Sequence, residues 1–214
     1  MSSGVLALGL VWCTALRADL SPAGDTAQEV LGNVRNKYET ITDADVRFTQ
    51  RVRMPLGRLE QSSTAILLMK KVNKYRIEFE HQVIVTDGET VWSYSASQQQ
   101  VLVDRFKMDE RSLSPDRVLR GEAGDLAAVV LGKEKLGKHD TVVLKLTPRE
   151  ESSLIKTLKL WVSESDWLVR KAEMVDLNGK ETTYTVTDIR VNPGLEDTRF
   201  TFTAPEGVEV VDLR

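Results

Sequence analysis

Few residues of this sequence could do catalytic or metal chemistry. Its two histidines, His81 and His139, are far apart in the chain, and neither belongs to an HExxH or another metal-ligand spacing. There is no GxSxG nucleophile elbow, no Walker phosphate loop and no GxGxxG dinucleotide motif. We therefore expect no catalytic residues, no metal site and no cofactor.

Acidic residues are the remaining candidates for chemistry. The stretch Asp176-Leu177-Asn178-Gly179 resembles the start of a calcium loop but lacks the later acidic ligands, and it fits a hairpin turn better. Carboxylate pairs such as Glu150-Glu151 fall at the ends of predicted strands, where a solvated role is favoured over acid and base catalysis. The sequence does not indicate an enzyme.

The single cysteine, Cys13, lies in the only long apolar run, from Val5 to Leu16. This run is shorter than the roughly 20 residues that span a bilayer, but it fits the apolar region of a secretory signal. We predict a signal peptide at residues 1–18, cleaved near Ala18. Lipid attachment at Cys13 is disfavoured because the bulky Trp12 precedes it.

The overall composition is that of a globular protein. The chain is 41% hydrophobic and 29% charged, with 29 basic and 32 acidic residues and a net charge of −3. Removing residues 1–18 would remove Arg17 and no acid, giving −3 − 1 = −4. Such a chain offers no basic field for a polyanion, so we expect no nucleic-acid partner. We expect one domain over residues 19–214.

The mature chain begins with a helical pattern. Val30, Leu31, Val34 and Tyr38 recur at helical spacing, which predicts a helix over about 25–40 with Asp25 or Thr26 as its N-cap. A second helical region is predicted near 114–132, starting at Ser114-Pro115-Asp116 and including a short piece over 125–131.

The rest of the chain alternates with the period of strands. Turn signals at Asp87-Gly88 and Asn178-Gly179 predict hairpins. Further strand patterns cover 141–146, 157–162, 167–176, 182–191 and 199–203. These elements predict a mainly β (α+β) fold: a single, strongly curved antiparallel sheet covered on its open side by helices.

Apolar side chains gather on particular strand faces. Ile77 and Phe79 share one face of a predicted strand, and Trp92 and Tyr94 share a face of another. These residues could simply fill a core. Alternatively, a curved sheet with few large side chains could leave an apolar cavity beneath the helices.

Several segments together resemble one known family. They are Phe48-Thr49-Gln50, the stretch 83–94 that ends in Val91-Trp92-Ser93-Tyr94, the turn at 176–179, and the C-terminal stretch 200–210 with its Phe-Thr-Phe and Pro-Glu-Gly-Val-Glu-Val sequences. In this order, from about 27 to 212, they resemble the periplasmic outer-membrane lipoprotein carrier (LolA-like) family.

The resemblance implies a fold and a role. The fold would be an incomplete antiparallel β-barrel with a helical lid over an apolar cavity. The role would be that of a monomeric, soluble periplasmic carrier, which takes acylated lipoproteins from an inner-membrane ABC transporter and delivers them to a receptor at the outer membrane. A triacylated lipoprotein exposes roughly 45 methylenes, which cost on the order of 36 kcal/mol in water, so it needs such a carrier.

Strand and helix alternation selects eight residues that would line this cavity. For any strand, the opposite pleat direction would place the selected side chains on the other face of the sheet. They are Phe48, Ile77, Phe79, Trp92 and Tyr94 on the sheet, and Val30, Leu31 and Val34 on the lid helix.

One position departs from the family pattern. The family has an Arg-Pro pair whose arginine ties the closed lid to the sheet, and here the matching residues are Lys71-Val72. Lys71 is the candidate for this lock, although lysine lacks the guanidinium fork. Alternatively, Lys70 and Lys71 are only an exposed strand end. The basic residues Arg47, Arg51, Arg53 and Arg58 could meet an acidic partner or form a solvated face.

Two other roles are compatible with the same half-barrel. One is a periplasmic sensor of lipid or mislocalised lipoprotein, although such sensors are usually longer than this chain. The other is the related outer-membrane receptor, which requires an acylated N-terminal cysteine that this sequence does not convincingly supply.

Overall fold

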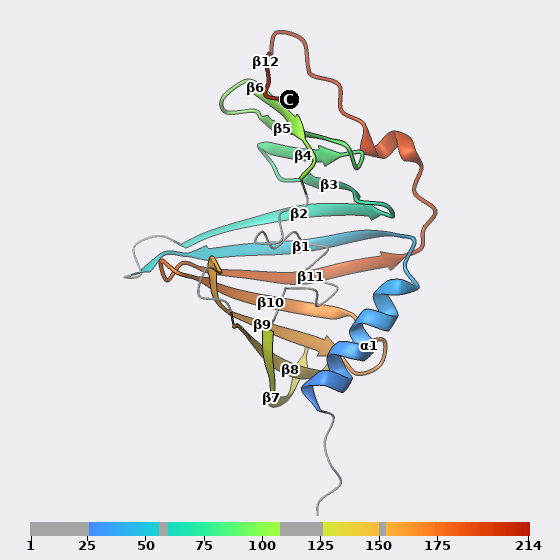
Figure 1. The fold of residues 1–214 in the computed structure, drawn as a ribbon, viewed down its shortest axis with the longest axis vertical. Coiled ribbons are helices and arrows are strands. Elements are labelled where there is room, and N and C mark those ends of the chain that lie inside the picture. The colour runs from blue at the N-terminus through green and yellow to red at the C-terminus, as the bar shows by residue number, and fades with distance from the viewer. Residues whose placement is uncertain (1–25, 56–59, 108–125, 150–152) are drawn as a thin grey trace, which may run out of the picture.

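One long curved sheet with a helix packed across it forms the fold (Figure 1). The computed structural model describes residues 26–55, 60–107, 126–149 and 153–214. The predicted signal peptide and the predicted helix start at Ser114 lie outside these residues. Within the described ranges, no helix is long and apolar enough to cross a membrane.

The helix α1 spans Ala27–Glu39 and confirms the helix predicted from the apolar spacing. Thr26 is its N-cap, and a capping box closes its first turn: Thr26 Oγ1 accepts from Glu29 N at 3.2 Å, and Glu29 accepts from Thr26 N at 2.7 Å. Ala27, Val30, Val34 and Tyr38 form the buried stripe.

Twelve strands follow the spatial order β12-β6-β5-β4-β3-β2-β1-β11-β10-β9-β8-β7. Their bounds are β1 Asp43–Arg53, β2 Glu60–Lys70, β3 Lys74–Glu78, β4 Gln82–Thr86, β5 Thr90–Ser95, β6 Gln100–Arg105, β7 Leu126–Leu136, β8 His139–Pro148, β9 Ile155–Ser163, β10 Val169–Asp176, β11 Glu181–Val191 and β12 Glu209–Asp212. All neighbours are antiparallel except β12 and β6.

The predicted hairpin turns are confirmed. Asp87-Gly88 joins β4 to β5, and Asn178-Gly179 joins β10 to β11. Gly88 and Gly179 have φ values of 100° and 77°, which a residue with a Cβ rarely adopts.

The short helix predicted over 125–131 is wrong within the described residues, because Leu126–Leu136 forms the edge strand β7. Leu126 and Ala128 pack against the core, a period of two, and Val129 and Val130 are β-branched residues that favour a strand. The ladder with β8 shifts register between Val130 and Gly132, which marks a β-bulge.

The strand predicted over 199–203 is also wrong. Asp197–Phe200 forms a short 3-10 helix, η2, and the chain then continues irregularly to β12. Tertiary contacts explain the difference: Phe200 is fully buried and Phe202 packs on Tyr94, while no described strand pairs with the backbone of this stretch.

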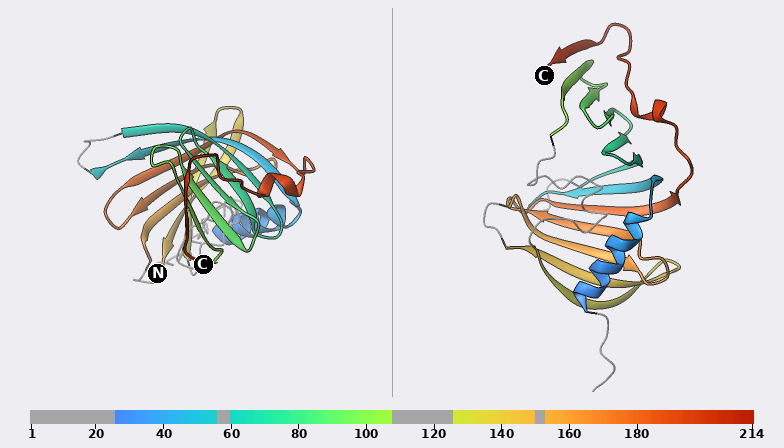
Figure 2. Two further views of the ribbon diagram at one scale, coloured as in Figure 1. Left: turned by 90° about the horizontal axis from the view of Figure 1, so that it is seen from above. Right: turned by 45° about the vertical axis from the view of Figure 1, so that its right-hand side comes forward.

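The sheet stays open. Its edges are β12 and β7, which do not pair with each other, and the right-hand view of Figure 2 shows α1 lying along the lower half of the curved sheet. This confirms the predicted fold class: mainly β, with one curved sheet that does not close into a barrel and a helix that covers one side.

Candidate functional site

The face of the sheet that α1 covers, called the inner face below, is traced by the strand register. Phe48 lies opposite Ala65, Leu67 opposite Ile77, and Ile77 opposite Ile84, with no register shift between these strands. Directly opposed residues share a face. The inner cluster therefore runs from Ile84 through Phe48 to the apolar residues of β8 and β9, and α1 adds Val30 and Val34 to it.

Six of the eight predicted lining residues belong to this inner cluster. Val30 and Val34 are fully buried, Phe48 and Ile77 are nearly so, and Leu31 and Phe79 pack against them. The Phe48 ring meets the Phe79 ring edge-on, with centroids 6.2 Å apart. In this state apolar side chains of α1 itself pack against the inner face.

Trp92 and Tyr94 lie on the opposite face. Ile84 faces Ser93, so the two aromatic residues pair instead with Val85 and Val83 on the outer side of the sheet. The strand β5 is half-buried on both faces, which is why its sequence pattern did not reveal the direction of its pleat.

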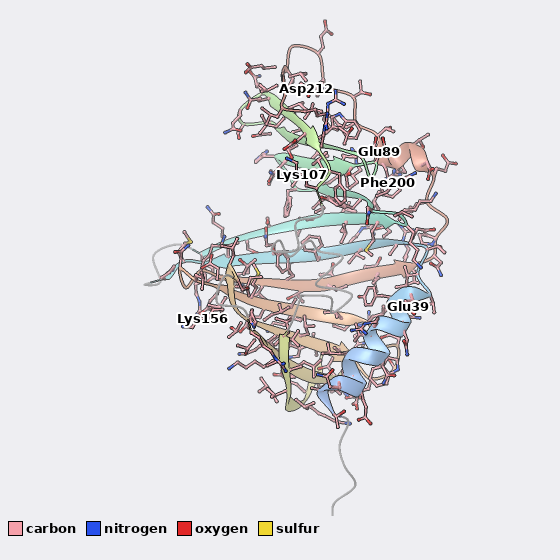
Figure 3. The ribbon with its side chains drawn as sticks, in the orientation of Figure 1. Glu39, Glu89, Lys107, Lys156, Phe200 and Asp212 are labelled. Carbon is pink, nitrogen blue, oxygen red and sulfur yellow. The ribbon has the colours of Figure 1, made fainter. Side chains whose placement is uncertain are left out.

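These two residues belong to a second apolar cluster, which we call the outer cluster. Its buried members lie on β2, β4 and β6 and in the C-terminal segment, residues 192–214, and they are Leu68, Val85, Val101, Val103 and Phe200. The Phe202 ring packs on Tyr94 with centroids 5.9 Å apart. In Figure 3, Phe200 is labelled beside the upper strands, away from Glu39 at the end of α1.

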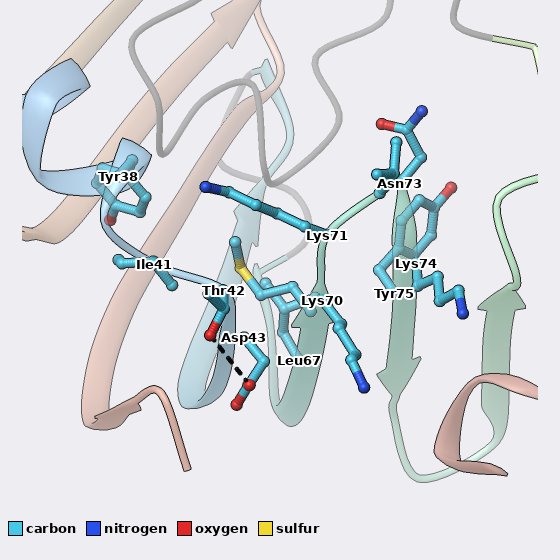
Figure 4. Close-up of a pocket in the computed structure, with 12 residues that line it drawn as sticks. Tyr38, Ile41, Thr42, Asp43, Leu67, Lys70, Lys71, Asn73, Lys74 and Tyr75 are labelled. Carbon is cyan, nitrogen blue, oxygen red and sulfur yellow. Dashed lines mark hydrogen bonds between the residues drawn. The ribbon is translucent and has the colours of Figure 1, made fainter. Parts of the chain in front are cut away.

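A pocket of about 250 Å³ opens between the C-terminal end of α1 and the β2–β3 hairpin (Figure 4). Its surface is mainly apolar and includes three lysines. The lining residues are Tyr38, Ile41, Thr42, Asp43, Leu67, Met69, Lys70, Lys71, Val72, Asn73, Lys74 and Tyr75. Burial raises the pKa of Tyr38, so its phenol stays neutral.

None of the eight predicted lining residues touches this pocket, but Lys71 does. Sequence reasoning missed Leu67 and Met69 as site residues, although their alternation along β2 matches that of Ile77 and Phe79. Tyr38 belongs to the apolar spacing that predicts the helix, but the sequence did not select it, Ile41 or Tyr75 as site residues. Their apolar spacing is visible in the sequence, but only the position of the C-terminal end of α1 in the fold shows that these residues line a pocket.

Lys70 and Lys71 are adjacent in the chain and extend from opposite faces of the sheet. Lys71 Nζ donates to the carbonyl oxygen of Glu39 at 2.6 Å, at the end of α1. Lys70 Nζ donates to the Leu195 carbonyl at 2.7 Å and lies 2.6 Å from Asp197 Oδ1. Figure 4 shows Lys71 extending toward α1 and Lys70 pointing the other way.

Asp197 joins this hairpin to the C-terminal segment. Hydrogen bonds from Lys70 and Lys74, the latter at 2.9 Å, lower the pKa of Asp197 from 3.8 to about 2. The pKa is depressed in the folded protein, so the contact stabilises fully above pH 3.8 and is lost as the pH falls through about 2.

We therefore expect Asp197→Asn to weaken the C-terminal segment at about pH 5, and the difference from the wild type to shrink as the pH falls through about 2, where the wild-type carboxylate becomes protonated. Proteolysis at the segment, measured as a function of pH with an acid-active protease, checks this. A wild-type-minus-variant difference that stays constant over this pH range would contradict the ion pair.

The predicted basic face is neutralised by carboxylates. Arg47 lies 3.8 Å from Asp188, Arg51 lies 3.1 Å from Glu60, and Arg53 pairs with Glu181. Arg58 is outside the described residues. These pairs favour the interpretation of a solvated outer face over that of a free cationic patch.

The histidines do not assemble a site. Among the described residues, no three His, Cys, Asp or Glu side chains are gathered so as to hold a metal ion. His81 lies at a strand end beside Glu80, and desolvation together with Arg170 lowers the pKa of His139.

The fold and site define an open antiparallel sheet whose apolar inner face is covered by a helix. The family described as outer membrane lipoprotein carrier protein LolA matches residues 39–203. The chain therefore belongs to the LolA family of lipoprotein carriers.

Individual relatives agree with this membership. An outer-membrane lipoprotein carrier protein of Pseudomonas aeruginosa (strain UCBPP-PA14) is 29% identical over 92% of this chain and 93% of its own length. One from Hahella chejuensis is 30% identical over 95% and 97%. The crystal structure of an uncharacterized conserved protein from Thermus thermophilus has a TM-score of 0.60 at 16% identity, covering 87% of this chain and 98% of its own, which supports the fold alone.

Proposed function

We propose that the inner face binds the acyl chains of lipoproteins after α1 moves away from it. The observation that carries this proposal is that α1 covers an apolar sheet with apolar side chains of its own, including Val30 and Val34. An acyl chain offers the sheet the same kind of contact, so one can replace the other at little net cost.

The size of the existing pocket supports movement of the helix. Sites for drug-sized ligands usually measure about 300–1,000 Å³. The pocket beside Lys71 measures about 250 Å³, too little for several acyl chains. It lies at the end of α1, so it gives an acyl chain a place to begin contact with the inner face.

The cellular role follows from the names of the relatives. Their names describe outer-membrane lipoprotein carriers. We infer that this protein is exported to the periplasm and works there as a monomer without catalysing a reaction. It accepts lipoproteins from an inner-membrane ABC transporter and passes them to a receptor at the outer membrane.

A matched pair of aromatic substitutions tests the proposal. Phe79 and Tyr94 are both half-buried, but Phe79 lies on the inner face and Tyr94 on the outer face. We expect Phe79→Gln to weaken binding of a fluorescent fatty acid about tenfold, and Tyr94→Gln to change it less than about twofold. Equal effects would contradict an inner-face site.

Transfer is tested separately with lipoproteins. The wild-type protein should take up a lipoprotein from inner-membrane vesicles that contain the transporter, and mass spectrometry should detect lipoprotein on the protein purified from the periplasm. A protein that binds no fatty acid and is repeatedly purified empty would overturn the proposed function.

A further inference from the structure

The link between α1 and β1, residues 40–42, is bound tightly to the far end of β11. Asn192 Oδ1 accepts from Thr42 N at 2.7 Å and from Thr42 Oγ1 at 3.1 Å, and Asn192 Nδ2 donates to the Thr40 carbonyl at 3.2 Å. The Asn192 side chain thus accepts hydrogen bonds from Thr42 and donates one to Thr40.

Asp43 completes the connection from the other side. Its carboxylate is buried, and Oδ1 accepts from Gly194 N at 2.9 Å and from Leu195 N at 3.3 Å. Its carbonyl accepts from Asn192 N at 2.8 Å. Asn192 therefore binds the link before β1, and Asp43 binds the segment after β11. The bonds to the Asp43 carboxylate are charge-assisted.

The β2–β3 hairpin joins the same junction. Lys71 N donates to the Thr42 carbonyl at 2.9 Å, while Lys70 and Lys74 hold Asp197. The end of α1, the hairpin and residues 192–197 of the C-terminal segment therefore share one polar junction. The N-terminal part of α1 contacts the sheet through apolar side chains instead.

We propose that Asn192 and Asp43 are positioning residues that fix the pivot about which α1 leaves the inner face. Directional hydrogen bonds hold the C-terminal end of the helix, and apolar contacts that an acyl chain can replace hold the rest. The helix therefore swings from its N-terminal end, and the C-terminal segment controls how readily it does so. This inference rests on the proposed opening of α1.

The same geometry changes the expected role of Lys71. Its bond to Glu39 lies next to the pivot, so it is close to the axis of the swing and resists the movement of the helix only weakly. The bond therefore contributes to the angle of the helix end more than to holding the N-terminal end closed.

Hydrogen exchange of the full-length protein without ligand tests the pivot. Asn192 has φ of 54°, so Asn192→Gly removes the side-chain bonds without straining the backbone. We expect the amides of α1 to exchange about tenfold faster or more, because the hydrogen bonds of the Asn192 side chain are lost. Asp43→Asn keeps its size and its acceptor but loses the charge, so its effect should be smaller, about threefold.

Gln99→Gly is the matched control. Gln99 has φ of 50° and an exposed polar side chain, in the turn between β5 and β6. This variant should leave the exchange of α1 within about twofold of the wild type.

Two results would overturn the proposal: unchanged exchange in α1 of Asn192→Gly, or equal acceleration throughout the sheet, which would indicate general destabilisation. The measurement needs no ligand, so it stays informative if the wild type proves unable to bind acyl chains, which is the separate failure of the proposed function.

Discussion

Phe200→Ala is expected to lower the free energy of unfolding by about 3–5 kcal/mol, the usual cost of truncating a fully buried phenylalanine. Phe200 has no exposed surface and lies in the outer cluster with Val85, Val101 and Val103. Its removal leaves a cavity between the C-terminal segment and the sheet. Urea denaturation measures the loss, and hydrogen exchange should show the largest change in residues 197–212.

Two substitutions in the same segment calibrate this result. Phe202 is half-buried against Tyr94, so Phe202→Ala should cost less than Phe200→Ala. Leu213 is 59% exposed, and Leu213→Ala should change stability by less than about 0.5 kcal/mol. If Phe200→Ala cost no more than Leu213→Ala, the C-terminal segment would not be packed as described.

Val34→Asp is expected to release α1 from the inner face. The Val34 side chain is completely buried between the helix and the sheet, and an unpaired buried carboxylate costs about 3–5 kcal/mol. The helix avoids this cost by leaving the sheet, which exposes the apolar inner face. We expect α1 to lose its protection from hydrogen exchange and the protein to bind a hydrophobic dye.

Asn36→Asp is the control for this change. It places the same side chain on the exposed side of the same helix, where it should leave the protection of α1 unchanged. If both variants behaved alike, helix propensity and not burial would hold α1 in place.

Lys71→Ala should have a much smaller effect than Val34→Asp. The Lys71–Glu39 hydrogen bond is exposed and contributes about 1 kcal/mol at most, so we expect no more than about a fivefold rise in the exchange of α1. The apolar stripe of the helix dominates closure. A loss of protection as large as that in Val34→Asp would show that Lys71 is a true lock.

Local sequence signals predicted most of the fold. The 3.6-residue spacing of Val30, Val34 and Tyr38 predicted α1, and the Asp-Gly and Asn-Gly turns predicted two hairpins. The errors at 126–131 and 199–203 share a cause, because neighbours distant in the chain determine both segments. β7 is a strand because β8 pairs with it, and residues 199–203 form the end of η2 and an irregular stretch, held by aromatic contacts such as Phe202 on Tyr94.

The inner cluster was predictable in its residue types, but the faces of the strands were not. Alternation placed Phe48, Ile77 and Phe79 together, and they do share the inner cluster. The same alternation could not tell that Trp92 and Tyr94 face outward, because β5 is half-buried on both faces and a separate apolar cluster lies on the outer one. Asn192 carried no sequence signal, since its partners Thr40 and Thr42 are adjacent only in the folded chain.

The pairing of β1 with β11 also determines the order in which the sheet can be completed. Strands β2 to β6 and strands β7 to β11 are each meanders of consecutive neighbours, and within the sheet only β1 connects the two. Because Ala44 pairs with Val191, this connection cannot be finished until nearly the whole chain is available. Such long loop closure slows folding, so we expect the central seam of the sheet to form after the local hairpins on either side of it.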